Sequence, residues 1–133
     1  MKPSVQILPI DGPAGTIETK VESPQEPRGI ALICHPHPLF GGTNDNKVVH
    51  TLASTFIRLA YAALRPNFRG VGASAGVHDD GGGETDDMLA VLDEARRIFG
   101  ELPVVLAGFS FGAYVQMRVA QTLAESGQAA QRL

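Results

Sequence analysis

The run "GIALIC" at residues 29–34 is apolar at every position instead of alternating with polar residues. The segments "AALRPNF" at 62–68 and "PVVLAG" at 103–108 resemble it. Continuous apolar runs of this length are typical of strands that are buried on both faces of a parallel sheet. The sequence therefore predicts a mostly parallel sheet with at least these three strands.

Between and after these runs, apolar residues recur at steps of three and four, which predicts helices at 46–61, 85–99 and 111–125. Asn44 or Asp45 is placed to cap the first of these helices. Strands that alternate with helices indicate the α/β class. We expect three α/β/α layers, with helices covering both faces of the sheet.

A different pattern precedes the first buried strand. Two short β-prone runs, at residues 4–10 and 15–21, are joined by the turn-forming cluster "DGPA". This arrangement predicts an antiparallel hairpin at the N-terminal side of the parallel sheet. With 133 residues, 44% of them hydrophobic, the chain is expected to form one soluble globular domain over residues 1–133.

The composition also excludes some classes of function. A formal net charge of −3 lacks the basic footprint of a nucleic-acid-binding protein. No apolar run approaches the roughly 20 residues that a membrane span needs, and the first residues do not read as a secretory signal. The single cysteine, Cys34, lies within an apolar run and is interpreted as a small core residue of a protein in the reducing cytoplasm.

One Gly-x-Ser-x-Gly motif, "GFSFG", stands between the predicted strand at 103–108 and the predicted helix at 111–125. In so tight a strand-to-helix turn the backbone is strained, and only small residues fit two positions before and after the serine, hence Gly108 and Gly112. The turn would raise the Ser110 hydroxyl above the sheet at the head of a helix, where a developing negative charge is favoured. We interpret Ser110 as an acyl-transfer nucleophile; the alternative is an ordinary helix-capping serine.

The loop "CHPHPLFGG" follows the strand at 29–34, where a hydrolase of this layout supplies a second oxyanion donor from a backbone N–H. Proline has no N–H, so within "HPHPL" only His35, His37 and Leu39 can donate. We choose the amide of His37, paired with that of Phe111. The alternative for this loop is a metal pair formed by His35 and His37.

Such a metal pair needs further ligands, and His78, Asp79 and Asp80 are the nearest candidates. No ligand spacing beyond His-x-His is regular, so no metal site is predicted. The glycine-rich loop "NFRGVGASAGVHDDGGGE" that holds these residues lacks the Gly-Lys-Ser/Thr of a phosphate-binding loop.

In that loop, Arg69 is expected to organise the backbone through hydrogen bonds; binding of an anionic substrate is the alternative. Beyond it, Asp86 and Asp87 fall in the first turn of the predicted helix at 85–99. Acidic side chains there suit the helix dipole, so they are interpreted as capping charges.

Three stretches together, "HPHPLFGGTNDNKVV", "RPNFRGVGASAG" and "GFSFGA", resemble the α/β-hydrolase superfamily. More narrowly, they are similar to its small uncapped bacterial members, which are related to dienelactone-hydrolase-like and esterase proteins. The likeness extends from about residue 5 to 125. It implies an esterase-like serine hydrolase with no metal and no organic cofactor. Ser110 would be the nucleophile, the amides of His37 and Phe111 would bind the oxyanion, and His35 would be a structural histidine.

The sequence departs from this resemblance in two places. At His78 the resemblance implies an aromatic or another apolar residue. The triad of the superfamily runs Ser, acid, His along the chain, yet after Ser110 there is no histidine or aspartate, and Glu125 is the only acid. We therefore expect residues 1–133 to be the N-terminal portion of a single α/β-hydrolase domain, an incomplete fold that lacks the strands carrying the triad Asp and His.

The predicted strand at 103–108 is as apolar as a central strand, which should have neighbours on both sides. The strand order that the resemblance implies places the strand at 29–34 on one side and the next strand in sequence on the other, yet no such strand is expected after it. Its other side would then be an exposed hydrophobic edge of the kind that soluble proteins normally cover. The sequence therefore suggests two kinds of partner: a small acyl substrate, and a second copy of the chain that pairs with this edge.

The first hypothesis is the nucleophile-bearing part of a cytoplasmic serine hydrolase that cleaves carboxylic esters or similar small acyl substrates through an acyl-serine intermediate. The 133-residue chain is expected to have little turnover of its own. His35 or His37 could replace the missing base, although a base also needs an orienting acid. The alternatives are a non-catalytic remnant or edge-pairing interaction module, and a metal-dependent hydrolase that uses His35 and His37.

Overall fold

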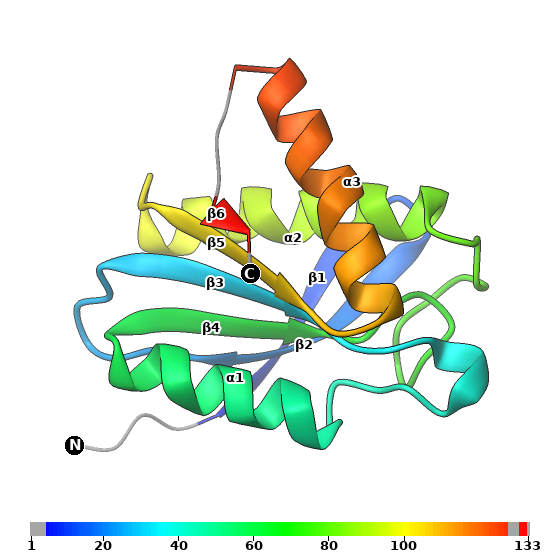
Figure 1. The fold of residues 1–133 in the computed structure, drawn as a ribbon, viewed down its shortest axis with the longest axis horizontal. Coiled ribbons are helices and arrows are strands. Elements are labelled where there is room, and N and C mark those ends of the chain that lie inside the picture. The colour runs from blue at the N-terminus through cyan, green and yellow to red at the C-terminus, as the bar shows by residue number, and fades with distance from the viewer. Residues whose placement is uncertain (1–4, 128–130, 133) are drawn as a thin grey trace.

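A six-stranded sheet forms the centre of the molecule, with the strand order β1-β2-β4-β3-β5-β6 (Figure 1). The computed structural model describes residues 5–127 and 131–132. The strands are β1 (Gln6–Gly12), β2 (Gly15–Glu22), β3 (Gly29–Cys34), β4 (Tyr61–Pro66), β5 (Val104–Gly108) and β6 (Gln131–Arg132). The helices are α1 (Lys47–Arg58), α2 (Gly82–Phe99) and α3 (Phe111–Glu125), with a short 3-10 turn at Pro38–Phe40.

The N-terminal hairpin is confirmed. Strands β1 and β2 pair antiparallel and close at the Gly12–Gly15 pair. Residue 4, where the first β-prone run was expected to begin, lies outside the described residues. Strand β2 then pairs antiparallel with β4, whereas β4, β3, β5 and β6 run parallel to one another. The hairpin therefore extends one side of a parallel sheet, as the sequence predicts.

Strand β3 explains why a continuous apolar run marks a central strand. Ile30, Leu32 and Cys34 join the core that lies under α2 and α3, while Ala31 and Ile33 join the core under α1. All five are fully buried. Burial also raises the pKa of the Cys34 thiol, in keeping with its interpretation as a core residue. A polar side chain at any of these positions would lose its contact with water on whichever face it pointed to.

The helices form the two outer layers. Helix α1 lies on one face, where Val49, Ala53 and Phe56 are buried, and α2 and α3 cover the opposite face (Figure 1). The predicted three-layer architecture is thus confirmed. Among the described residues, no helix has both the length and the apolar character that crossing a membrane requires.

The far side of β5 differs from the sequence-based expectation. Strand β6 pairs with it in parallel, with Val105 opposite Gln131 and Leu106 opposite Arg132. The prediction that no strand follows on this side is therefore wrong over these two pairs. Val104 and Val105 are only 5% and 7% exposed, so this part of the edge is not an open hydrophobic surface.

Candidate active site

Three loops meet at one end of the parallel sheet. They follow β3, β4 and β5, whose carboxyl ends point in the same direction because the three strands are parallel (Figure 1). In open α/β sheets, ligands bind outside the carboxyl ends of the strands. Ser110, His37, Arg69 and His78 all come from these loops, so the topology brings the sequence-predicted residues to one end of the molecule.

The turn between β5 and α3 holds Ser110 in a backbone conformation that non-glycine residues rarely adopt, with φ 59° and ψ −119°. The residue is exposed and immediately precedes the first residue of α3. Its side chain makes no capping hydrogen bond to the helix, and the described residues offer its hydroxyl no other partner. The capping alternative therefore has no support, and the role of the hydroxyl as a nucleophile stays a prediction.

The two glycines of the motif lie where backbone segments touch. A Cβ on Gly108 would lie 2.6 Å from the carbonyl carbon of Gly112, and a Cβ on Gly112 would lie 2.6 Å from the carbonyl carbon of Cys34. The amide of Phe109 also donates to the carbonyl oxygen of Cys34, at 3.2 Å. Together these contacts hold the serine turn tightly against the end of β3.

The loop after β3 brings His37 next to the head of α3. The His37 and Phe111 rings have centroids 4.8 Å apart. The N–H of Leu39 donates to Nδ1 of His37 at 3.1 Å, which removes Leu39 from the three candidate donors of this loop. Phe111 is the first residue of α3, where backbone N–H groups have no intrahelical acceptor. Both chosen amides therefore stay available for an oxyanion, and their role stays a prediction.

His35 ties two of the loops together. Its Nε2 accepts a hydrogen bond from the N–H of Phe68, at 3.0 Å, and its Nδ1 lies 2.7 Å from the carbonyl oxygen of Pro36. Nδ1 must therefore carry the proton, and both ring nitrogens are occupied. The ring is fully buried, and this burial lowers the pKa of His35 to about 4. These contacts suit a structural histidine.

Stability should consequently fall in mild acid. The pKa of His35 is lowered in the folded state from 6.5 to about 4, so the unfolded chain binds a proton that the folded chain excludes. Neutral His35 contributes about 3 kcal/mol to the free energy of unfolding. This contribution is fully present above pH 6.5 and is lost as the pH falls towards 4. Urea unfolding of the wild type and His35→Gln at several pH values checks this. The difference in free energy of unfolding between the wild type and His35→Gln should shrink as the pH falls from 6.5 to 4. A difference that stays constant over this range would contradict the prediction.

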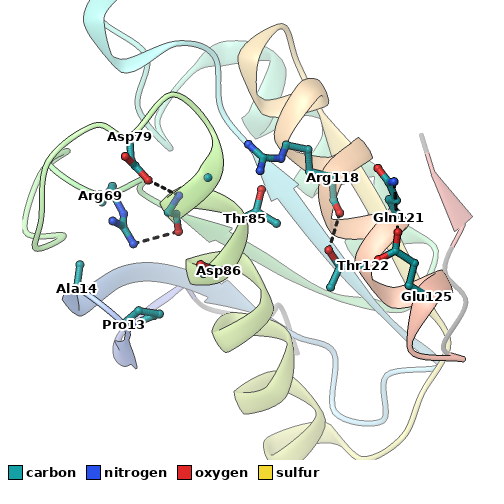
Figure 2. A pocket seen from close by; sticks show the side chains of 12 residues that line it. Pro13, Ala14, Arg69, Asp79, Thr85, Asp86, Arg118, Gln121, Thr122 and Glu125 are labelled. Carbon is teal, nitrogen blue, oxygen red and sulfur yellow. Dashed lines mark hydrogen bonds between the residues drawn. The ribbon is translucent and has the colours of Figure 1, made fainter.

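Arg69 binds residues near the amino end of α2. Its guanidinium pairs with both carboxylate oxygens of Asp87, at 2.8 Å each, and donates to the carbonyl oxygen of Gly83 at 3.0 Å. The Asp87 carboxylate raises the pKa of Arg69. Arg69 and Asp79 line a polar hollow of about 640 Å³ (Figure 2), and neither Ser110 nor Phe111 is among the residues that line it. This set of contacts suits the loop-organising role.

Sequence reasoning assigned the wrong role to one acidic residue at the start of α2 and missed another. Helix α2 begins at Gly82, three residues before the expected start, so Asp87 lies beyond its first turn and is buried against Arg69 instead of capping the helix. Glu84 is also fully buried. Its two oxygens accept hydrogen bonds from the amides of Asp79 and Gly81, at 2.9 and 3.0 Å. A Glu three residues after Gly81 is the sequence signal that could have located this helix start.

His78 belongs to the same cluster of rings. Its centroid lies 4.6 Å from that of His37 and 5.3 Å from that of Phe111. The metal alternative needs three ligands, and no three His, Cys, Asp or Glu side chains that could hold an ion gather within residues 5–127. His35, its first ligand, already uses both ring nitrogens.

Comparison with known proteins identifies relatives of this chain. No protein-family model matches this sequence. An uncharacterised protein of Rickettsia prowazekii is 43% identical in an alignment of 114 residues that covers 82% of this chain and 47% of the relative. An α/β serine hydrolase without a lid from Xanthomonas campestris is 40% identical with a TM-score of 0.86, over 91% of this chain and 57% of that chain. An α/β serine hydrolase homologue from Coxiella burnetii is 43% identical with a TM-score of 0.81, over 90% of this chain and 58% of that chain.

The chain thus spans about half the length of the Rickettsia relative and less than three fifths of the two solved chains. Over that length, both the fold and the sequence agree with those of serine hydrolase homologues. By fold and by sequence similarity, the chain belongs to the α/β-hydrolase superfamily.

Proposed function

We propose that the chain carries the nucleophile of a serine hydrolase that cleaves carboxylic esters or similar small acyl substrates. The observation that carries this proposal is the backbone of Ser110, held at φ 59° with an exposed hydroxyl that does not cap the following helix. Such strain persists only where the surroundings enforce it, and it gathers at functional sites. The similarity to solved α/β serine hydrolase homologues supports the same role.

In the proposed reaction, the Ser110 oxygen attacks the carbonyl carbon of the ester while its proton passes to a base. The carbonyl oxygen becomes an oxyanion and accepts hydrogen bonds from the amides of His37 and Phe111. The positive end of the α3 dipole favours this negative charge. When the intermediate collapses, the alcohol leaves with a proton and an acyl group remains on Ser110. Water then hydrolyses this acyl-serine.

The 133-residue chain is proposed to complete this cycle slowly. Its described residues place no base within hydrogen-bond distance of the Ser110 hydroxyl. Oxyanion donors alone leave a residual acceleration of about 10³ to 10⁴ over water in serine proteases. With an activated ester, whose leaving group departs without taking up a proton, acylation of Ser110 is expected to be faster than the hydrolysis that follows it, because that hydrolysis still needs a base to activate water.

A p-nitrophenyl ester tests the proposal. The wild-type chain should release up to about one equivalent of p-nitrophenol and then turn over slowly, as expected of a covalent intermediate. Ser110→Ala should show neither phase. Ser54→Ala, at an exposed position of α1, is the matched control and should behave like the wild type. An unchanged time course for Ser110→Ala would remove Ser110 from the mechanism.

A further inference from the structure

An apolar hollow of about 430 Å³ lies between the loop that follows β3 and the loop that follows β4. Pro38 and Leu39 line it from the first loop, and Val71, Val77 and His78 line it from the second. Its volume falls within the range of small-molecule sites, which are lined mainly by apolar side chains. The steps proposed for the serine reaction use none of these side chains.

Two of these side chains are exposed apolar groups. Leu39 is 71% exposed and Val77 is 78% exposed. Single exposed apolar residues are ordinary on a protein surface, whereas a group of them around one hollow indicates a binding surface. A hydrocarbon group that fills the hollow would remove part of both side chains from water, which is favourable.

The hollow adjoins the proposed oxyanion site. Pro38 directly follows His37 in the chain, so the hollow begins one residue, about 3.8 Å, from the residue whose amide is proposed to bind the oxyanion. The ring of His78, which also lines the hollow, has its centroid 4.6 Å from that of His37 and 5.3 Å from that of Phe111. A carbonyl group held by the two proposed amides therefore lies beside the hollow, within reach of a chain attached to its carbon.

The charges around the hollow favour an uncharged occupant. Arg69 is the only Lys, Arg, Asp or Glu among the described residues that line it. Both oxygens of the Asp87 carboxylate pair with the Arg69 guanidinium, at 2.8 Å each. The Thr43 hydroxyl, which also lines the hollow, accepts from the amide of Asp45 at 3.1 Å. An anionic group would leave water here without an unbalanced positive charge to receive it, which is costly.

We infer that this hollow binds the hydrocarbon chain of the acyl group, and that Leu39 and Val77 set a preference for longer uncharged acyl groups over acetyl. The inference rests on the proposed function of Ser110, because the acyl group is the part of the substrate that is transferred to the serine oxygen. The acyl chain stays bound through both chemical steps, so its contacts with the hollow orient the carbonyl carbon in each of them.

Two p-nitrophenyl esters test this preference, because the acetate and the hexanoate share a leaving group and differ by four CH₂ groups. The quantity measured is the second-order rate constant of the Ser110-dependent burst, divided by the rate constant of the same ester with hydroxide. Each fully buried CH₂ favours binding about fourfold. Because the hollow is open to solvent and covers only part of the chain, the hexanoate should acylate the wild type about 10-fold faster than the acetate.

Val77→Ser and Leu39→Ser remove apolar surface at exposed positions, and each should lower the ratio of hexanoate to acetate rates to about 3. Val5→Ser is the matched control, because Val5 is an exposed valine before β1 that does not line the hollow, and it should keep the wild-type ratio. Both esters are measured on the same sample, so the ratio does not depend on the fraction of protein that is active. Circular dichroism confirms that each variant folds.

A charged ester tests the electrostatic part of the inference. Mono-p-nitrophenyl adipate carries a carboxylate where the hexanoate has its terminal methyl group, and it should react on the order of 10-fold more slowly than the hexanoate. A faster reaction of the adipate would show that Arg69 recognises an anionic acyl group, and it would overturn the inference.

Two further outcomes would overturn the inference and leave the proposed function intact. One is a wild-type ratio near one, or a ratio that neither Val77→Ser nor Leu39→Ser changes, which would place the acyl chain elsewhere. The other is a dimer in size-exclusion chromatography that Val77→Ser converts to a monomer, which would assign the hollow to a second copy of the chain. A burst that does not exceed the Ser110→Ala background with either ester would instead overturn the proposed function itself.

Discussion

Gly112→Ala is expected to lower the free energy of unfolding by about 3 kcal/mol, the upper end of the usual cost of overpacking. An alanine Cβ at this position would lie 2.6 Å from both the carbonyl carbon of Cys34 and the carbonyl oxygen of His35, and closer still to the Cys34 oxygen. All three atoms belong to the backbone, so no side chain can turn away. Alanine gains up to about 1 kcal/mol over glycine in a helix, and the clash outweighs that gain.

Chemical unfolding of the wild type and Gly112→Ala measures this difference, and the melting temperature should fall on the order of 10 °C. Gly82→Ala is the matched control, because it also adds a methyl group in the first turn of a helix. The nearest atom there is the end of the flexible Asp79 side chain, at 3.2 Å. The control should change stability by less than about 0.5 kcal/mol. Equal stability of all three proteins would show that the serine turn is not packed as the structure has it.

The fold could be predicted because its strongest signals are local. A strand buried on both faces must be apolar at every position, so "GIALIC" was recognisable as β3 without any neighbour. Element ends were less certain, since several polar residues compete for one cap. Asn46 caps α1 by accepting from the amides of Val48 and Val49, whereas the sequence favoured Asn44 or Asp45. Asn44 is instead buried and bonded to Asn67 and the Arg65 carbonyl.

The site was predictable only in part, because some of its residues are marked by a local motif and others only by their burial in the folded protein. The serine turn could be recognised because its signal is local: a glycine stands two positions before Ser110 and another two positions after it. The role of Asp87 depends on its contact with Arg69, which lies 18 residues away in the sequence. Glu84 bonds to the nearby amides of Asp79 and Gly81, but its burial is not visible in the sequence, since an acid near a helix start is ordinarily solvated. Strand β6 was missed because two residues of a polar tail carry no periodic pattern.

Ser110 is expected to take up one equivalent of a fluorophosphonate, and Ser110→Ala none, which is the largest change in reactivity predicted for any single substitution in this chain. The expectation follows from the turn, which holds the hydroxyl exposed at the amino end of α3 and leaves it without an intramolecular partner among the described residues. Serines on helix surfaces have no such activation. Ser54 on α1 therefore stays unmodified in the same protein and serves as an internal reference.

The measurement that tests the central claim most directly is peptide mass spectrometry of the full 133-residue chain after prolonged incubation with the probe. The account predicts a single phosphonyl adduct, located on the peptide that contains Ser110 and absent from Ser110→Ala. An adduct on another residue, or a protein that stays unmodified, would contradict it.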